Sequence, residues 1–149
     1  MSMEQILATV RGLDGVLELA PTVGSTFPEI SWGDHFFYFA PDGVVPRHQP
    51  YATIVSKDYP GDDLSDLDRS GRRRLNIHVG RAAVDELAST DGVVDFAATD
   101  VVLPHPVYAR QGWVSIVEPG PRTSGLAVDL LHGAHESARR RAGHRSGGH

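Results

Sequence analysis

Hydrophobic residues recur at helical spacing near both ends of the chain. At the N-terminus, Ser2 and Gln5 have the form of a capping box, which marks a helix start. Gly12 and Gly15 interrupt the hydrophobic pattern that follows, so a short helix is expected. Near the C-terminus, a second helix is expected from about residue 124 to 141. Its hydrophobic positions are Leu126, Leu130, Leu131 and Ala134.

Between these helices, short runs rich in β-branched and aromatic residues predict strands. They cover residues 16–19, 35–39, 51–55, 74–79 and 113–117, separated by Pro, Gly and Asp turn residues. Residues 82–87 read as another helix, and residues 91–106 as irregular structure. The order predicts an α+β fold in one domain, residues 1–142, with an antiparallel sheet of about five strands and the terminal helices packed on it. Residues 143–149 are expected to form a disordered tail.

Side chains alternate between the two faces of the predicted strand 74–79. Leucine, isoleucine and valine occupy one face, which is expected to be core. The opposite face carries Arg74, Asn76 and His78, which can hydrogen-bond a ligand.

The predicted strand 35–39 has aromatic residues on both faces. Alternation places Phe37 and Phe39 with His35, and leaves Phe36 and Tyr38 on the other side. Core packing explains one face. The second face must also be covered, by a helix, by a partner subunit or by a flat hydrophobic ligand.

Composition narrows the functional classes. The 149 residues include no cysteine, which excludes disulfides and thiolate chemistry, and the formal net charge of −5 disfavours nucleic acid as a partner. No signal peptide or membrane-spanning run is evident, so a cytoplasmic protein that does not bind membranes is expected. Phosphate-binding and serine-hydrolase motifs are absent, and the eight histidines form no HExxH or HxH pattern, so we predict no metal and no cofactor.

Six motifs together resemble an actinobacterial family of unknown function, and the resemblance covers nearly the whole chain. The motifs are FPEISWGD (27–34), YATIVSKDYP (51–60), LDR (67–69), RLNI (74–77), LPHPVYA (103–109) and QGWV (111–114). More distantly, the layout is similar to the MmcQ/YjbR-like fold. That likeness implies a curved sheet between an N-terminal and a closing helix. Some members of this wider group are associated with drug resistance or DNA binding, but no shared active-site motif carries either role over.

Charged and aromatic residues near the strand 74–79 suggest a binding site. Arg74 and Lys57 would anchor negative or carbonyl oxygens, and Asn76 would orient the ligand. Further candidates are Asp58, Asp68 and Arg69 for polar contacts and Trp32, Tyr59 and Trp113 for stacking. The alternative is that Asp68 and Arg69 only cap a turn and that Lys57 pairs with Asp58 in solvent.

Two histidines are candidates for acid–base chemistry near neutral pH. His78 lies on the predicted strand, and His105 lies between two prolines that stiffen its backbone. Asp58 or Asp68 could orient either ring. A structural hydrogen bond from His105 to a loop carbonyl is the competing interpretation.

Three hypotheses follow. The leading one is a small-molecule-binding protein of actinobacterial specialised metabolism, with an accessory or self-resistance role. A second is a cofactor-independent isomerase, cyclase or lyase that uses a His/Asp pair; whether the protein is an enzyme stays open. A third is a homodimeric interaction module without a small-molecule site.

Overall fold

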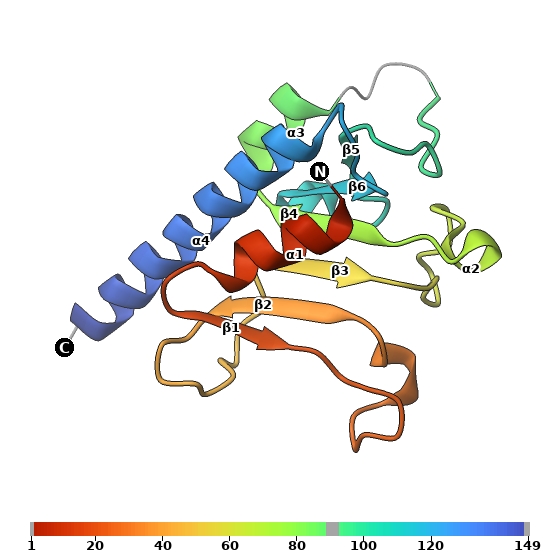
Figure 1. Cartoon of the computed structure of the whole chain (residues 1–149). Coiled ribbons are helices and arrows are strands. Elements are labelled where there is room, and N and C mark those ends of the chain that lie inside the picture. Colours follow the sequence, from red (N-terminus) through yellow and green to blue (C-terminus); the bar gives the residue numbers. More distant parts are fainter. Residues whose placement is uncertain (1, 89–92, 148–149) are drawn as a thin grey trace.

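The computed structural model describes residues 2–88 and 93–147, without the side chains of residues 69, 70 and 144–147. It shows one antiparallel sheet with a layer of helices (Figure 1). The strands are β1 (Val16–Leu19), β2 (His35–Phe39), β3 (Ala52–Val55), β4 (Arg74–His78), β5 (Leu103–Pro104) and β6 (Trp113–Val117), in the spatial order β1-β2-β3-β4-β6-β5. The helices are α1 (Met3–Arg11), α2 (Leu67–Ser70), α3 (Arg81–Leu87) and α4 (Ser124–Gly147), with 3₁₀ turns η1 (Glu29–Ser31) and η2 (Ala109–Gln111).

The α+β class and the antiparallel sheet with terminal helices are confirmed. The sheet has six strands instead of about five, because β5 lies in the segment predicted to be irregular and pairs with β6. Helix α4 extends to Gly147, beyond the expected end near residue 141 and into the segment expected to be a tail. Among the described residues, no helix is long and apolar enough to cross a membrane.

Helices α1 and α4 lie on the same face of the sheet and contact each other. The predicted capping box is present in α1, where the backbone N–H of Ser2 donates to Gln5 Oε1 at 2.6 Å and that of Gln5 donates to Ser2 Oγ at 3.3 Å. The two helices bury their apolar stripes against the sheet. The helix residues in this core are Met3, Ile6, Leu7, Val10, Ala127, Leu131, Ala134 and Ala138, and those from the sheet include Phe37, Ile54, Leu75, Ile77, Val114 and Ile116.

On the opposite face of the sheet, Leu67 of α2 packs against Val55 and Val117 at one end of the strands, and the rest of the face differs in composition from the helix-side core. Strand register aligns Phe36 with Thr53, Thr53 with Asn76, and Asn76 with Ser115, so these four side chains form a row across the sheet. Because side chains alternate, this face holds the residues that the helix-side core excludes. It therefore forms the base of the site described next.

Candidate functional site

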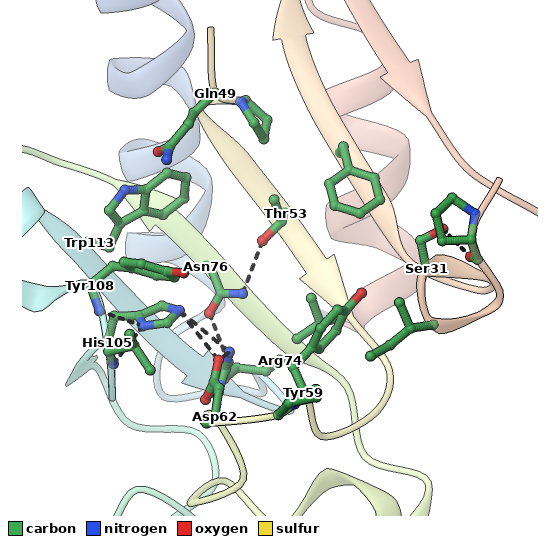
Figure 2. A pocket seen from close by; sticks show the side chains of 18 of the residues that line it. Ser31, Gln49, Thr53, Tyr59, Asp62, Arg74, Asn76, His105, Tyr108 and Trp113 are labelled. Carbon is green, nitrogen blue, oxygen red and sulfur yellow. Dashed lines mark hydrogen bonds and ion pairs between the residues drawn. The ribbon is translucent and has the colours of Figure 1, made fainter.

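A cavity of about 660 Å³ lies over this second face of the sheet (Figure 2). Its floor comes from strands β2, β3, β4 and β6. Its walls come from four loop segments, residues 28–31, 49–50, 59–62 and 105–108. The aromatic lining consists of Phe36, Tyr38, Tyr59, Tyr108 and Trp113. The polar part of the lining is concentrated around Arg74.

Arg74 is the central polar residue of the cavity and is only 2% exposed. Its Nη1 and Nη2 donate to the two carboxylate oxygens of Asp62 at 2.9 and 2.6 Å. Nη1 also donates to Ser65 Oγ at 2.9 Å, and Nε donates to Asn76 Oδ1 at 2.8 Å. Burial alone would raise the pKa of the Asp62 carboxyl, but the hydrogen bonds and charge of Arg74, with a contribution from His105, hold it below its ordinary value. The two side chains therefore form a largely buried ion pair joined by two hydrogen bonds.

Asn76 connects this pair to the neighbouring strands. Its Oδ1 accepts from Ser115 Oγ at 2.8 Å as well as from Arg74, and its Nδ2 donates to Thr53 Oγ1 at 3.0 Å. Asn76 and Ser115 are both buried. The floor is thus a hydrogen-bonded network that spans β3, β4 and β6.

His105 forms the wall next to Arg74, with a distinctive hydrogen-bond pattern. Its Nδ1 lies 3.0 Å from the backbone nitrogens of both Val107 and Tyr108, which donate to it. A nitrogen that accepts two N–H groups carries no proton, so we assign the neutral tautomer with the proton on Nε2. Burial, followed by the charge of Arg74, lowers the pKa of His105 to about 4, although Asp62 opposes the shift. The ring is therefore a neutral hydrogen-bond donor at physiological pH.

Asp34 is fully buried and holds the wall of the cavity formed by Tyr59 and residues 28–31. Its Oδ1 accepts from the N–H and hydroxyl of Ser56, both at 2.9 Å, and from Lys57 Nζ at 3.0 Å. The hydroxyl of Tyr59 donates to its Oδ2. Lys57 Nζ also donates to the carbonyl of Trp32 at 2.8 Å. These bonds hold the end of β3 against the loop that contains η1.

Five of the predicted site residues line the cavity: Tyr59, Arg74, Asn76, His105 and Trp113. Five others lie outside its lining. Lys57 is bound to Asp34, and the Nε1 of Trp32 donates to the carbonyl of Phe27 at 2.9 Å. The side chain of Arg69 lies outside the described part of the chain.

The other three predicted residues that lie outside the cavity also have protein partners. Asp58 Oδ1 accepts from the N–H of Leu67 at 2.9 Å, and Asp68 Oδ1 accepts from the N–H of Asp58 at 3.0 Å, so the two carboxylates fix the loop before α2. His78 Nε2 donates to the carbonyl of Gln111 at 3.0 Å, and its ring lies edge to face with that of Trp113, with the ring centroids 5.5 Å apart. The structure therefore does not bring His78, Asp58 and Asp68 together with His105.

Sequence reasoning missed Asp62, the partner of Arg74. Asp62 is one of the Pro, Gly and Asp turn residues that separate the predicted strands, and no local pattern shows that its turn folds over the sheet. Ser65, Tyr108 and Ser115 were also missed. Tyr108 lies three residues beyond His105 in the LPHPVYA motif, which was the available signal.

The described residues include no group of three or more His, Asp or Glu side chains placed to hold a metal ion. The groups that face the cavity are instead an ion pair, a neutral imidazole, hydroxyls and aromatic rings. This chemistry suits recognition of a polar atom on an otherwise apolar molecule.

Comparison with known proteins gives one informative result. Neither curated proteins nor solved structures show a significant match. The sequence profile of a family of unknown function, DUF6194, matches residues 1–147, and the chain therefore belongs to that family.

Proposed function

We propose that this protein binds a small, mainly apolar molecule in the cavity over the second face of its sheet. The observation that carries the proposal is the combination of a preformed polar floor with aromatic walls in one cavity of about 660 Å³. Ligand sites of proteins have volumes of roughly 300–1,000 Å³ and place a few polar groups in an apolar lining. The buried Arg74 network has this arrangement.

The rim of the cavity supports the same function. Ile30, Val107 and Tyr108 line the cavity and are 40%, 44% and 48% exposed. Large apolar side chains that remain exposed around a cavity are stabilised when a ligand removes them from water. A bound molecule would bury the surface that the loops leave open.

The biological setting that we propose is a cytoplasmic accessory or self-resistance role in actinobacterial specialised metabolism. The motif resemblance supports this setting. We also propose that the layout of the fold is MmcQ/YjbR-like. A neutral, hydrophobic product with a polar group would fit both the cavity and such a role.

The geometry favours binding over acid–base catalysis. Asp58 and Asp68 accept from backbone N–H groups, and His78 lies outside the cavity lining. His105 is close to the ligand position, but its Nδ1 is occupied by two N–H donors. Proton transfer by a His/Asp pair would require partners that these residues do not provide to one another.

Binding can be tested with Prodan, a neutral naphthyl ketone that fluoresces strongly in apolar surroundings. We expect the wild-type protein to bind it, and Val107→Trp, which fills the cavity, to weaken binding at least about fivefold. Val45→Trp is the matched control, because Val45 is also 44% exposed but does not line the cavity. Its affinity should stay within about twofold of wild type.

Equal affinities of the two variants would place the dye elsewhere and contradict the proposal. Native mass spectrometry of the same samples tests the homodimer hypothesis, because it measures the oligomeric mass of each variant. A wild-type dimer that Val107→Trp converts to a monomer, without dye binding by either, would favour an assembly interface at the rim.

A further inference from the structure

We propose that the cavity holds one neutral carbonyl oxygen of its ligand between two N–H donors, Nη2 of Arg74 and Nε2 of His105. This inference rests on the proposed function and specifies the ligand class. It predicts a flat, apolar ligand with an uncharged carbonyl, such as an aromatic ketone, quinone, lactone or amide.

One N–H donor of Arg74 faces His105. A guanidinium has five N–H groups. Four donate to Asp62, Ser65 and Asn76, through Nη1 twice, Nη2 once and Nε once. The second N–H of Nη2 has His105 Nε2, 3.4 Å away, as its polar neighbour among the described residues.

His105 Nε2 also carries a proton. Nδ1 of His105 accepts from two backbone N–H groups, so the single proton of the neutral ring is on Nε2. Nη2 and Nε2 are then both donors and cannot bond to each other. The nearest carboxylate oxygen, Asp62 Oδ2, lies 3.9 Å from Nε2, which is beyond hydrogen-bonding distance.

Two donors 3.4 Å apart can share one acceptor. An oxygen at about 2.9 Å from each nitrogen satisfies both, since this is the ordinary N–H···O length. Figure 2 shows Arg74, Asp62 and His105 converging at one end of the cavity. A ligand oxygen at this end would remove the cost of leaving two buried donors unpaired.

The charge around the donors selects a neutral oxygen. Both carboxylate oxygens of Asp62 bind Arg74, so the pair has no net charge, and the neutral His105 adds none. A ligand carboxylate would meet the Asp62 carboxylate without a free cation to compensate it. A ligand carbonyl needs no further partner, whereas a ligand hydroxyl would also have to donate its proton to a remaining lone pair of Asp62, because Asn76 Oδ1 already accepts two hydrogen bonds.

The rest of the cavity defines the body of the ligand. Phe36 and Tyr38 line it from β2, and Trp113 lines it from β6. Rings on both sides of the floor favour stacking with a planar molecule. A fused aromatic system with one carbonyl satisfies both parts of the site.

Three naphthalene probes of matched shape test the inference by calorimetry: 2-acetylnaphthalene, 2-isopropenylnaphthalene and 2-naphthoate. The alkene replaces the ketone oxygen with a CH₂ group, and the third probe carries a carboxylate. We expect the wild-type protein to bind the ketone about tenfold more tightly than the alkene. The carboxylate should bind more weakly than the ketone.

Two variants of His105 separate the functions of its two nitrogens. In His105→Asn, the amide oxygen can replace Nδ1 as acceptor from the loop, but the Nε2 donor is lost. In His105→Gln, an amide N–H can reach the Nε2 position instead. We expect the ratio of ketone affinity to alkene affinity to fall below about threefold in His105→Asn and to be largely retained in His105→Gln.

A measurement on the wild-type protein covers the case in which neither variant folds. The infrared C=O stretch of bound 2-acetylnaphthalene should lie at lower wavenumber than in hexane, because two donors polarise the bond. Equal wild-type affinities for ketone and alkene, tightest binding of the carboxylate, or an unshifted stretch would overturn the carbonyl site and leave the cavity as a binding site. If none of the probes binds, the proposed function itself fails and the carbonyl site with it.

Discussion

His105 is held in an environment that prevents its protonation. Two backbone N–H groups point at Nδ1, and the charge of Arg74 lies beside Nε2. A proton on Nδ1 would break both loop hydrogen bonds. The residue therefore stabilises the loop 105–108 only as a neutral imidazole.

The pH dependence of stability should show this effect. The pKa of His105 is about 4 in the folded protein, against an ordinary value of about 6.5. Above about pH 6.5 the ring is neutral in both states and stability is unaffected. Between pH 6.5 and 4 the unfolded chain takes up the proton and the folded chain does not, so the free energy of unfolding decreases as the pH falls.

Urea unfolding at pH 7.5 and pH 4.5 measures this contribution. We expect the wild-type protein to lose about 2–3 kcal/mol more than His105→Asn, which cannot be protonated in this range. Subtracting the change measured for His105→Asn from the change measured for the wild-type protein removes the effects of the carboxylates that titrate in both. Parallel pH profiles would show that His105 titrates normally in the folded state.

The sequence predicts the sheet face that a residue occupies more reliably than it predicts the hydrogen-bond partner of that residue. Alternation along β4 placed Arg74 and Asn76 together, and both line the cavity. His78 is on the same face, but cross-strand pairing sets it beside Trp113 and outside the cavity lining. The partnership of Arg74 with Asp62 depends on a loop that folds back over the sheet, and no local spacing encodes that path.

Two glycines allow the end of β4 to approach the start of β6. Gly80 follows β4 and Gly112 precedes β6, with φ of 92° and 96°. The carbonyl of Gly112 accepts from the N–H groups of Val79 at 2.8 Å and Gly80 at 3.1 Å. A Cβ on Gly112 would lie 2.9 Å from the Cα of Gly80, so the contact requires glycine.

Gly112→Ala should destabilise the protein by about 2–3 kcal/mol. The positive φ costs about 1 kcal/mol, and the backbone clash adds a similar or larger amount. Gly43→Ala is the matched control, because Gly43 has φ of 76° but no atom within 4 Å of an added Cβ. Urea unfolding should show a loss of only about 1 kcal/mol for the control, and equal losses would mean that the clash relaxes without cost.

Elements with a hydrophobic pattern were predictable, including the four-residue strands β1 and β3, whereas the two-residue strand β5 was not. The capped helix α1 and the strands β2, β4 and β6 lie where the hydrophobic pattern placed them. Strand β5 has two residues and includes Pro104, so it has no periodicity to detect. It forms because β6 offers a free edge beside it, which is a property of the assembled sheet.

A buried polar connection joins the helix layer to the sheet. The hydroxyl of Tyr51 lies 2.9 Å from Nδ1 of His135 on α4, and His135 Nε2 donates to the carbonyl of Asp14 at 2.7 Å. Tyr51 and His135 are both 3% exposed. The connection links α4, the segment that enters β3 and the loop between α1 and β1.

A double-mutant cycle should measure this coupling across the molecule. Tyr51→Phe and His135→Leu each leave a buried partner unpaired, whereas the double variant removes both groups. We expect a coupling free energy of about 1 kcal/mol from urea unfolding. Tyr38→Phe combined with His135→Leu is the control, since Tyr38 lines the cavity on the other side of the sheet. Its cycle should be additive within about 0.5 kcal/mol.

The strand order also determines how the protein avoids aggregation. The two outer strands of the described sheet are β1 and β5. β5 is too short to template another strand, and its Pro104 has no N–H to donate. β1 has four residues and carries the charged Glu18, which is paired with Arg11 and His35. Neither outer strand is suited to adding a strand from a second chain, so amyloid-like stacking would first require the native sheet to open.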